Sequence, residues 1–440
     1  MKEVCVNFAR KALLFMLFIR AGADGLFGLA RFEEGGFTPG AILNLAAIGL
    51  FFVCLAATRG ANLKIPALIW SPYLLIAAAS LAYTPDFFGG VRLFMSTLTF
   101  PAIFGAMFML IRTEAQLASL LRTILLSSLI PSVVAIYQLA TDGLDERLQS
   151  TLGHANVFAF YIIAILVCII YYQRIVRPPL LDRLFLAGYA ALQLLFLLFT
   201  QTRSAWGAAV VLAAIYAVGI DRRLLLAVPL IPLVLLLPPV ADRLADVDLG
   251  QSASYEDVQT GRVVLNSYAW RKKLWSSALD DSADSRLLGK GLNSFHHNSP
   301  SFFPLIANGA STEAHSGYVQ TIYETGLSGL LAYIWVYVGV AAAAFVHRSR
   351  RAKEAWLIYA FVAANLVINY SDNTPYYLPY NWYLWAILAA DLSLRVSRRT
   401  NPQTIHSFHP QPTPASVGAN QRGNSIARFQ RSNRCIHHLR

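Results

Sequence analysis

Charged residues are scarce in this chain, where Asp, Glu, Lys and Arg make up only 14% of the 440 residues. Soluble domains carry about 25%, and the share of hydrophobic residues here is correspondingly high at 56%. This composition excludes an ordinary soluble domain and indicates a polytopic membrane protein. The net charge of +12 does not indicate a nucleic-acid partner, because the basic residues lie between apolar segments and in the C-terminal tail, without interleaved aromatics.

Cysteine is scarce as well. The four cysteines are far apart, and none lies in a segment that we expect outside the cell membrane: Cys5, Cys54, Cys168 and Cys435. This spacing excludes a disulfide framework and a CxxC metal knuckle.

Long hydrophobic runs, in contrast, are abundant. Segments of about 17 to 25 apolar residues are long enough to cross a bilayer as helices. Such segments lie at about 11–30, 40–57, 65–83, 93–111, 120–140, 154–173, 184–200, 204–220, 223–240, 316–346, 355–370 and 376–394. The sequence therefore predicts an all-α polytopic membrane protein with about twelve transmembrane helices.

Lys and Arg concentrate in alternate loops, and loops of this kind lie on the cytoplasmic side of a membrane. These loops carry Arg59 and Lys64; Arg112 and Arg122; Arg174, Arg177 and Arg183; Arg222 and Arg223; Arg348, Arg350, Arg351 and Lys353; and Arg395, Arg398 and Arg399. Both termini are therefore expected inside. The predicted organisation is transmembrane helices in 1–240, an outward loop with surface helices in 241–315, transmembrane helices in 316–396 and a polar, disordered cytoplasmic tail in 397–440.

The first apolar segment has two interpretations. Lys2, Arg10 and Lys11, followed by a short apolar run and Ala21-Gly22-Ala23, resemble a secretory signal peptide. Residues 25–30 prolong the apolar run, so we expect a retained first helix.

Within the outward loop, residues 260–280 have helical composition, and one face would carry Val264, Tyr268, Trp275 and Leu279. Trp275 and the adjacent basic residues suit the boundary between membrane and water. We predict a helix that lies on the membrane surface.

His315 lies where the outward loop joins the apolar segment 316–346. An imidazole titrates near neutral pH and can accept a proton from a hydroxyl group. Gly326 and Gly329 are small enough to let a neighbouring helix approach closely. Glu324 would lie about 13 to 14 Å deeper than His315 on the opposite helix face, which favours a structural role over catalysis.

Two arginines are predicted on the outward side with His315. Arg203 occupies a very short turn between apolar segments, where a charge usually has a polar function; the alternative is a snorkelling arginine, with Ser204 capping the next helix. Arg271 precedes Gly289-Lys290-Gly291, and a guanidinium group can bind phosphate oxygens bidentately. The alternative for Arg271 is the solvated basic face of a surface helix.

A third outward cluster contains Arg147, Gly153, His154 and Asn156, just before an apolar segment. Asn156 could hydrogen-bond a sugar or cap the following helix. The local sequence favours capping.

Taken in order, these motifs resemble the O-antigen ligase and polymerase superfamily, and above all the O-antigen ligases of lipopolysaccharide assembly. The likeness covers residues 130–330 by motif and the whole chain by topology. The motifs are Gly153 and Asn156 before a helix, Thr202-Arg203-Ser204 on a short outward turn, Arg271-x-x-Leu274-Trp275 followed by Gly289-x-Gly291, and His315-Ser316-Gly317-Tyr318 with Glu324-x-Gly326-x-x-Gly329.

One element departs from the family pattern. The family usually has Gly-Arg directly before the Leu-Trp element, whereas here Trp270 precedes Arg271 and the Gly-Arg pair is Gly261-Arg262. The spacing from Trp275 to Gly289 favours Arg271 as the counterpart, and Arg262 is the alternative.

The resemblance implies a GT-C-like glycosyltransferase of the Gram-negative inner membrane, with its active site on the periplasmic face. It implies transfer of O-antigen from undecaprenyl diphosphate to a sugar hydroxyl of lipid A-core, with inversion at the anomeric carbon. The partners would be these two glycolipids and the lipid bilayer. The implied site contains the base His315, the diphosphate-binding residues Arg203, Arg271 and Arg147, and the supporting residues Asn156, Lys290 and Glu324.

We expect neither a metal nor another cofactor. Many membrane glycosyltransferases hold a divalent cation on aspartates, but Asp280, Asp281 and Asp284 are interpreted as the solvated end of a helix. The adjacent His296 and His297 lack the spacing of a zinc site. Arginines can supply the positive charge instead.

Three other activities remain as alternatives. A Wzy-type polymerase and a protein O-oligosaccharyltransferase share the donor chemistry, although the single large outward loop favours a ligase. A transporter of lipid-linked glycans would also carry intramembrane charges and glycine-bearing helices. Against a transporter, the polar groups gather at the outer surface and no internal repeat is evident.

Overall fold

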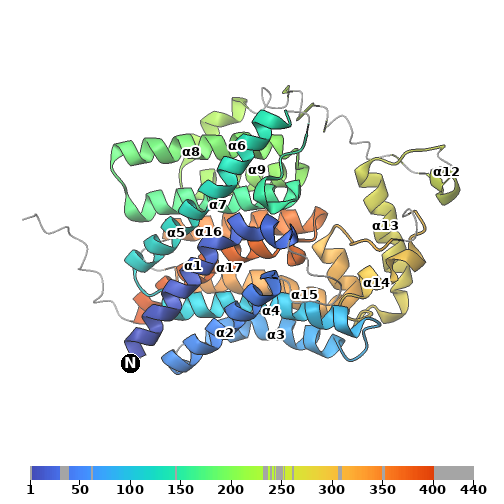
Figure 1. Ribbon diagram of the computed structural model, residues 1–440, viewed down its shortest axis with the longest axis horizontal. Coiled ribbons are helices and arrows are strands. Elements are labelled where there is room, and N and C mark those ends of the chain that lie inside the picture. The colour runs from blue at the N-terminus through green and yellow to red at the C-terminus, as the bar shows by residue number, and fades with distance from the viewer. Residues whose placement is uncertain are drawn as a thin grey trace, which may run out of the picture. The chain divides into compact units, whose positions relative to one another are not determined.

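The computed structural model describes residues 2–400, apart from 30–38, 61–62, 144–145, 231–235, 238–239, 242, 244–250, 252, 260–261, 306–309 and 349–351. Every regular element in these ranges is a helix, and no strand is present among them (Figure 1). The predicted all-α class is confirmed for this part of the chain. The predicted tail lies outside the described residues from 401 onward, and residues 397–400 continue the last helix.

Six stretches among the described residues are long and apolar enough to cross a membrane, which supports a multi-pass membrane protein. They are α2 (Pro39–Thr58), α4 (Phe87–Leu110), α5 with α6 (Glu114–Thr141), α7 (Ala155–Val176), α8 (Leu180–Phe199) and α15 (Gly317–Val346). The remaining predicted spans correspond to other helices: α1 (Lys2–Leu29), α3 (Lys64–Ser80), α9 (Arg203–Gly219), α16 (Ala352–Ser371) and α17 (Leu378–Thr400). Six membrane spans are thus supported by length and composition, and the predicted number of about twelve is not confirmed.

Two predicted spans are not single α-helices. The segment 120–140 is divided at Ser128 into α5 (Glu114–Ser127) and α6 (Leu129–Thr141). Pro131 has no N–H to donate to the preceding turn, which explains a break at this place. The segment 223–240 begins as the 3₁₀ helix η2 (Arg222–Leu230) and then runs partly outside the described residues; its four prolines oppose a continuous α-helix.

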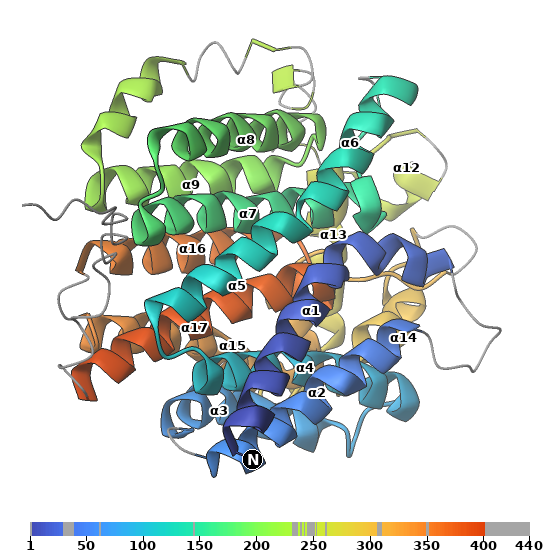
Figure 2. The same ribbon diagram turned by 60° about the vertical axis from the view of Figure 1, so that its left-hand side comes forward.

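The helix α7 lies at the centre of the bundle. It packs against α5, α8, α9, α16 and α17 (Figure 2), and its side chains are buried without interruption from Ala155 to Ile169. The peripheral helices instead expose large apolar side chains, such as Leu181 and Phe185 of α8. Exposed apolar faces of this kind suit contact with lipid.

The described part of the outward loop contains four short helices. They are α12 (Tyr255–Gln259), α13 (Ser267–Asp281), η3 (Ala283–Ser285) and α14 (Ser294–Phe302). The labelled ones, α12, α13 and α14, lie at one end of the long helices (Figure 1). The predicted helix 260–280 thus begins at Ser267, where the side chain of Asn266 accepts hydrogen bonds from the first-turn N–H groups.

The predicted apolar face of this loop helix is wrong. Val264 precedes α13 and is 83% exposed, and Leu279 is 39% exposed. The buried face instead carries Ala269, Leu274 and Ala278. Leu274 and Ala278 pack with Phe295 of α14 and Tyr323 of α15. The helix is therefore held by protein contacts on the face that contains Leu274.

The helix α15 is broken at Gly326, which has φ 69° and ψ −170°. Residues 286–291 fill the break: the Tyr323 and Glu324 carbonyls accept from Lys290 and Gly291 N–H, while Leu327 and Ser328 N–H donate to the Arg286 and Leu287 carbonyls. A Cβ at Gly326 would lie 2.3 Å from the Leu287 carbonyl carbon. The close approach that was expected from a neighbouring helix therefore comes from a loop.

Candidate functional site

Several helix ends meet at a single buried turn that follows α16. The N–H of Gly317, the first residue of α15, donates to the Asp372 carbonyl at 2.9 Å. Asn156, in the first turn of α7, donates through Nδ2 to the Asp372 carboxylate at 2.7 Å. Arg271 of α13 donates through Nη1 to the Ser371 carbonyl at 2.7 Å. The turn thus joins the starts of α7 and α15 to the outward loop.

His315 lies two residues before α15, in the left-handed conformation with φ 51°. The conformation costs a non-glycine residue about 1 to 3 kcal/mol, and such strain is common at functional sites. The ring is half-buried, with its centroid 6.0 Å from that of Trp270. Burial, together with the positive charges of Arg271 and His154, lowers the pKa of His315 to about 4. The imidazole is therefore neutral at neutral pH and can accept a proton.

No hydrogen bond joins the His315 ring to another residue in the part of the chain that the structure describes. The backbone next to His315 is fixed, because Ser316 caps α15 through a hydrogen bond from the Val319 N–H. A half-buried imidazole of this kind is open to a ligand hydroxyl.

Arg271 and Arg262 have different surroundings. The Arg262 side chain is 67% exposed, with Nη1 3.7 Å from Asp257. Arg271 is half-buried, and its charge acts on His315. Its Nε and Nη2 make no hydrogen bond to another described residue, and this leaves donors available for a ligand. The geometry therefore places Arg271 beside His315 and Arg262 on the surface.

Arg203 is the first residue of α9, and Thr202 is the N-cap residue. Ser204 lies inside the helix, so the alternative in which Ser204 caps α9 is wrong. Arg203 donates through Nη1 to the carbonyl of Arg243 at 3.0 Å, and Arg243 donates through Nε to Gln201 at 3.0 Å. The sequence analysis missed Arg243, although its position at the start of the outward loop was a usable signal.

Arg147 binds the protein through two of its nitrogens. Nε donates to the Thr200 carbonyl at 3.1 Å, and Nη2 donates to Asn156 Oδ1 at 2.6 Å and to Thr202 Oγ1 at 3.1 Å. Nη1 makes no hydrogen bond to the other described residues. Arg147 therefore fastens the loop before α7 to the turn before α9 and keeps one nitrogen for a ligand.

Four arginines form what we call the arginine cluster: Arg147, Arg203, Arg243 and Arg271. Their proximity is evident at Arg147, whose pKa is lowered by burial and by the charges of the other three, while Asp372 opposes this shift. A concentration of guanidinium groups around one buried carboxylate provides a site for a strongly negative ligand.

Asn156 does not cap α7, contrary to the favoured prediction. The N-cap residue is His154, whose Nδ1 accepts from the Asn156 N–H at 3.2 Å. The Asn156 side chain is buried and connects Arg147 to Asp372. The alternative, a hydrogen bond from Asn156 to a sugar, stays a prediction.

Asp372 is the main residue that the sequence analysis missed. Its side chain is 1% exposed and accepts from Asn156 Nδ2 and from the Tyr377 hydroxyl at 2.5 Å. Burial raises the pKa of Asp372 to about 6, against the opposing effects of Tyr377 and Arg271. The signal in the sequence was an acidic residue in the short turn between the predicted spans 355–370 and 376–394.

Lys290 and Glu324 lie in other hydrogen-bond networks. Lys290 Nζ is 2.7 Å from Asp281, which also accepts from the Tyr323 hydroxyl at 2.6 Å. Glu324 is 3% exposed and accepts from Gln320 Nε2 at 2.5 Å. No hydrogen bond connects either side chain directly to His315 or to the arginine cluster among the residues described. Lys290 therefore fastens the outward loop to α15, and Glu324 lies within the bundle.

The expected solvated aspartates differ from one another. Asp280 and Asp284 are exposed, whereas Asp281 is half-buried and paired with Lys290. His296 pairs with Glu313 at 3.2 Å, a contact that raises the pKa of His296. In the described ranges, no group of three His, Cys, Asp or Glu side chains could hold a metal ion.

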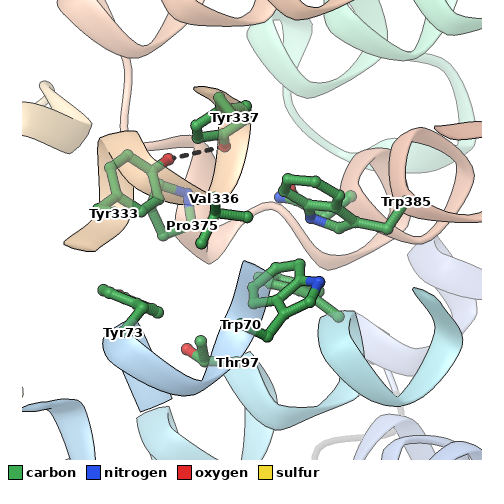
Figure 3. Close-up of a pocket in the computed structure, with 10 residues that line it drawn as sticks. Trp70, Tyr73, Thr97, Tyr333, Val336, Tyr337, Pro375 and Trp385 are labelled. Carbon is green, nitrogen blue, oxygen red and sulfur yellow. Dashed lines mark hydrogen bonds between the residues drawn. The ribbon is translucent and has the colours of Figure 1, made fainter. Parts of the chain in front are cut away.

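An internal cavity lies between α3, α4, α15 and α17, with mainly aromatic walls (Figure 3). It is lined by Trp70, Tyr73, Thr97, Phe100, Tyr333, Val336, Tyr337, Pro375, Asn381 and Trp385. The Tyr333 and Tyr337 hydroxyls hydrogen-bond at 3.0 Å on one side of it. A second cavity shares Tyr73, Thr97 and Pro375 and reaches Glu324. Neither cavity is lined by His315 or by the arginine cluster.

Residues 188–334 match the family model described as O-antigen ligase, which confirms the resemblance found from the motifs. The matched region includes Arg203, Arg271 and His315, while Arg147, Asn156 and Asp372 lie outside it. No protein in a comparison with curated sequences matches the chain.

Proposed function

We propose that this chain, which carries an O-antigen ligase family domain, is a membrane glycosyltransferase that ligates O-antigen to lipid A-core. The donor is O-antigen polysaccharide on undecaprenyl diphosphate, and the acceptor is a sugar hydroxyl of the core oligosaccharide. The reaction takes place at the periplasmic face of the inner membrane. The observation that carries the proposal is the neutral His315 ring, open to a ligand, beside Arg271 and the arginine cluster.

His315 acts as the general base in this proposal. The acceptor oxygen attacks the anomeric carbon while the bond from that carbon to the diphosphate oxygen breaks, and the hydroxyl proton passes to the imidazole. A pKa of about 4 makes His315 a weak base. Transfer becomes favourable late in the reaction, when the acceptor oxygen has gained positive character. Because the enzyme supplies no nucleophile, the displacement is single and inverts the anomeric centre.

The arginine cluster stabilises the diphosphate as it departs. Arg271 offers Nε and Nη2, Arg147 offers Nη1, and Arg203 adds its charge at the start of α9. Guanidinium groups keep their charge at every physiological pH and bind phosphate oxygens bidentately. Charge that develops on the leaving group is thereby offset in the transition state.

The same cluster supports a metal-independent reaction. Arginines can supply the positive charge that a divalent cation supplies in other membrane glycosyltransferases. Three of the four arginines come from separate elements whose positions are fixed by hydrogen bonds to backbone carbonyls. This fixed geometry requires little rearrangement when the diphosphate binds.

Apolar surface on the outer helices accommodates the lipid portions of both substrates. Leu194 and Leu195 of α8, on the half of the helix that leads to the outward turn at Arg203, are 48% and 44% exposed. Polyprenyl and acyl chains can contact such a surface within the bilayer without exposure to water.

The direct test incubates purified protein with undecaprenyl-diphosphate-linked glycan and lipid A-core in EDTA. Formation of lipid A-core carrying the glycan is the expected result. Lengthening of the lipid-linked glycan without use of lipid A-core would establish a polymerase, and glycan on an added acceptor protein would establish an oligosaccharyltransferase. If no glycosidic product forms, translocation of the lipid-linked glycan in proteoliposomes tests the transporter alternative.

A further inference from the structure

We infer that Asp372 is a positioning residue for the glycosyl transfer, because it holds the polar start of α7 and the start of α15 against one turn. The inference rests on the proposed function and deepens it. It concerns a residue outside the region matched by the family model.

Both the carboxylate and the backbone carbonyl of Asp372 accept hydrogen bonds. The carboxylate accepts from Asn156 Nδ2 through one oxygen and from the Tyr377 hydroxyl through the other. Its backbone carbonyl accepts from the Gly317 N–H at 2.9 Å, two residues after His315. One residue therefore connects α7, α15 and the start of α17.

The carboxylate cannot act on substrate directly. It is 1% exposed, and each of its oxygens already accepts a hydrogen bond from the protein. Its effect must pass through its neighbours. Asn156 transmits it to Arg147, and the adjacent Ser371 carbonyl holds Arg271 at 2.7 Å.

Charge gives Asp372 a second effect on the same residues. The cluster concentrates four guanidinium groups. The negative charge of Asp372 favours the charged form of Arg147, and the positive charge of Arg271 in turn favours the ionised carboxylate of Asp372. An attractive carboxylate among cations reduces their mutual repulsion and so holds them in place before a diphosphate arrives. Removing the charge would leave the cluster more positive and less ordered.

We therefore expect Asp372→Asn to lower turnover without weakening the binding of free diphosphate. A more positive cluster binds the free diphosphate at least as tightly as in the wild type, because one repelling charge is absent. Turnover falls, because the amide that replaces the carboxylate cannot supply two acceptor oxygens, and the arginines and His315 lose their fixed arrangement. Replacement of a residue needed only for folding would not separate diphosphate binding from turnover in this way.

Asp391→Asn is the matched control. Asp391 is also 1% exposed and pairs with Arg395 four residues along α17, away from the turn. Loss of this buried pair destabilises the fold without touching the arginine cluster. The Asp391→Asn variant therefore measures how much a loss of stability alone lowers turnover.

The experiment determines kcat, KM for the donor and the Kd for undecaprenyl diphosphate in the wild type, Asp372→Asn and Asp391→Asn, together with their thermal midpoints. We expect kcat to fall about 10- to 100-fold in Asp372→Asn with Kd unchanged or lower, and kcat to remain within about twofold in Asp391→Asn. An unchanged kcat in Asp372→Asn overturns the inference, as does a fall that Asp391→Asn reproduces. A wild type that neither binds the diphosphate nor transfers glycan overturns the proposed function instead, and the inference with it.

Discussion

Asn156 Nδ2 lies 2.7 Å from the Asp372 carboxylate, although 216 residues separate them in the sequence. The contact joins the first turn of α7, whose side chains are buried from Ala155 to Ile169, to the turn between α16 and α17. Asn156 also accepts hydrogen bonds from Arg147 and Thr202. The Asn156 side chain therefore fixes the position of the arginine cluster relative to the turn that contains Asp372.

Replacement of Asn156 is therefore expected to impair the site more than the fold of the lipid-facing helices. Asn156→Asp would place a second carboxylate against Asp372, and the repulsion should lower turnover and the thermal midpoint together. Asn156→Ala leaves one oxygen of the buried Asp372 carboxylate without its hydrogen bond, which costs about 1 to 3 kcal/mol, while Arg147 keeps its bonds to Thr200 and Thr202. Thermal denaturation and glycan transfer measure both effects. Equal behaviour of the Asp and Ala variants would contradict the electrostatic account.

The pH dependence of transfer should show an acid limb near pH 6. Asp372 has its pKa raised to about 6 by burial, and the active form requires the carboxylate. As pH falls through 6, Asp372 takes up a proton and activity declines, while His315 stays neutral down to about 4 because its pKa is lowered. The groups that face Asp372 are Arg147, Arg271 and Tyr377.

This limb is measured as kcat between about pH 5 and 8, where unperturbed histidines also titrate. In Asp372→Asn the residual activity should show no limb near pH 6. If the decline in kcat near pH 6 persists in Asp372→Asn, another titrating group causes it.

Arg271 and Arg262 offer a test of the family correspondence. Arg271→Ala should weaken undecaprenyl diphosphate binding by about 10- to 100-fold, since a hydrogen bond to a charged group contributes about 1.5 to 3 kcal/mol. Arg262→Ala should alter it by less than about twofold, because Arg262 is 67% exposed. Isothermal titration or competition binding distinguishes the two. A larger effect at Arg262 would reverse the assignment.

The break in α15 predicts a strong requirement for glycine at position 326. Gly326→Ala puts a Cβ 2.3 Å from the Leu287 carbonyl carbon and forces φ 69°, so we expect a loss of about 3 kcal/mol or more in stability. Gly49→Ala is the control, because a Cβ there meets nothing within 4 Å. Thermal midpoints in detergent compare them. A Gly326→Ala midpoint equal to that of Gly49→Ala would show that the break is not needed.

Local patterns predicted the helices well because the length of an apolar run is a local property. The segments 40–57, 154–173 and 316–346 correspond closely to α2, α7 and α15. At 223–240 the described residues begin with the 3₁₀ helix η2, since prolines oppose a continuous α-helix, and the rest of the predicted span lies partly outside the described residues. The same reasoning failed for α13, whose buried face is determined by packing against α14 and α15.

The site was only partly predictable for a related reason. Arg203 and His315 could be selected because each lies at a recognisable junction between apolar and polar sequence, and Arg271 because it belongs to the motif with Leu274-Trp275 and Gly289-x-Gly291. The sequence positions of Asp372 and Arg243 are weak signals, because their roles depend on hydrogen bonds to residues 216 and 40 positions away. The Gly326 break depends on hydrogen bonds from residues 286–291, which no local pattern encodes.

The central claim is that His315 accepts the acceptor proton. Single-turnover transfer with preformed complexes of enzyme, undecaprenyl-diphosphate-linked glycan and lipid A-core measures this step in the wild type and His315→Gln. Loss of a general base typically slows the step by about 10²- to 10⁴-fold, and we predict a loss in this range with undecaprenyl diphosphate binding retained. A His315→Gln rate within about twofold of the wild type would contradict the account.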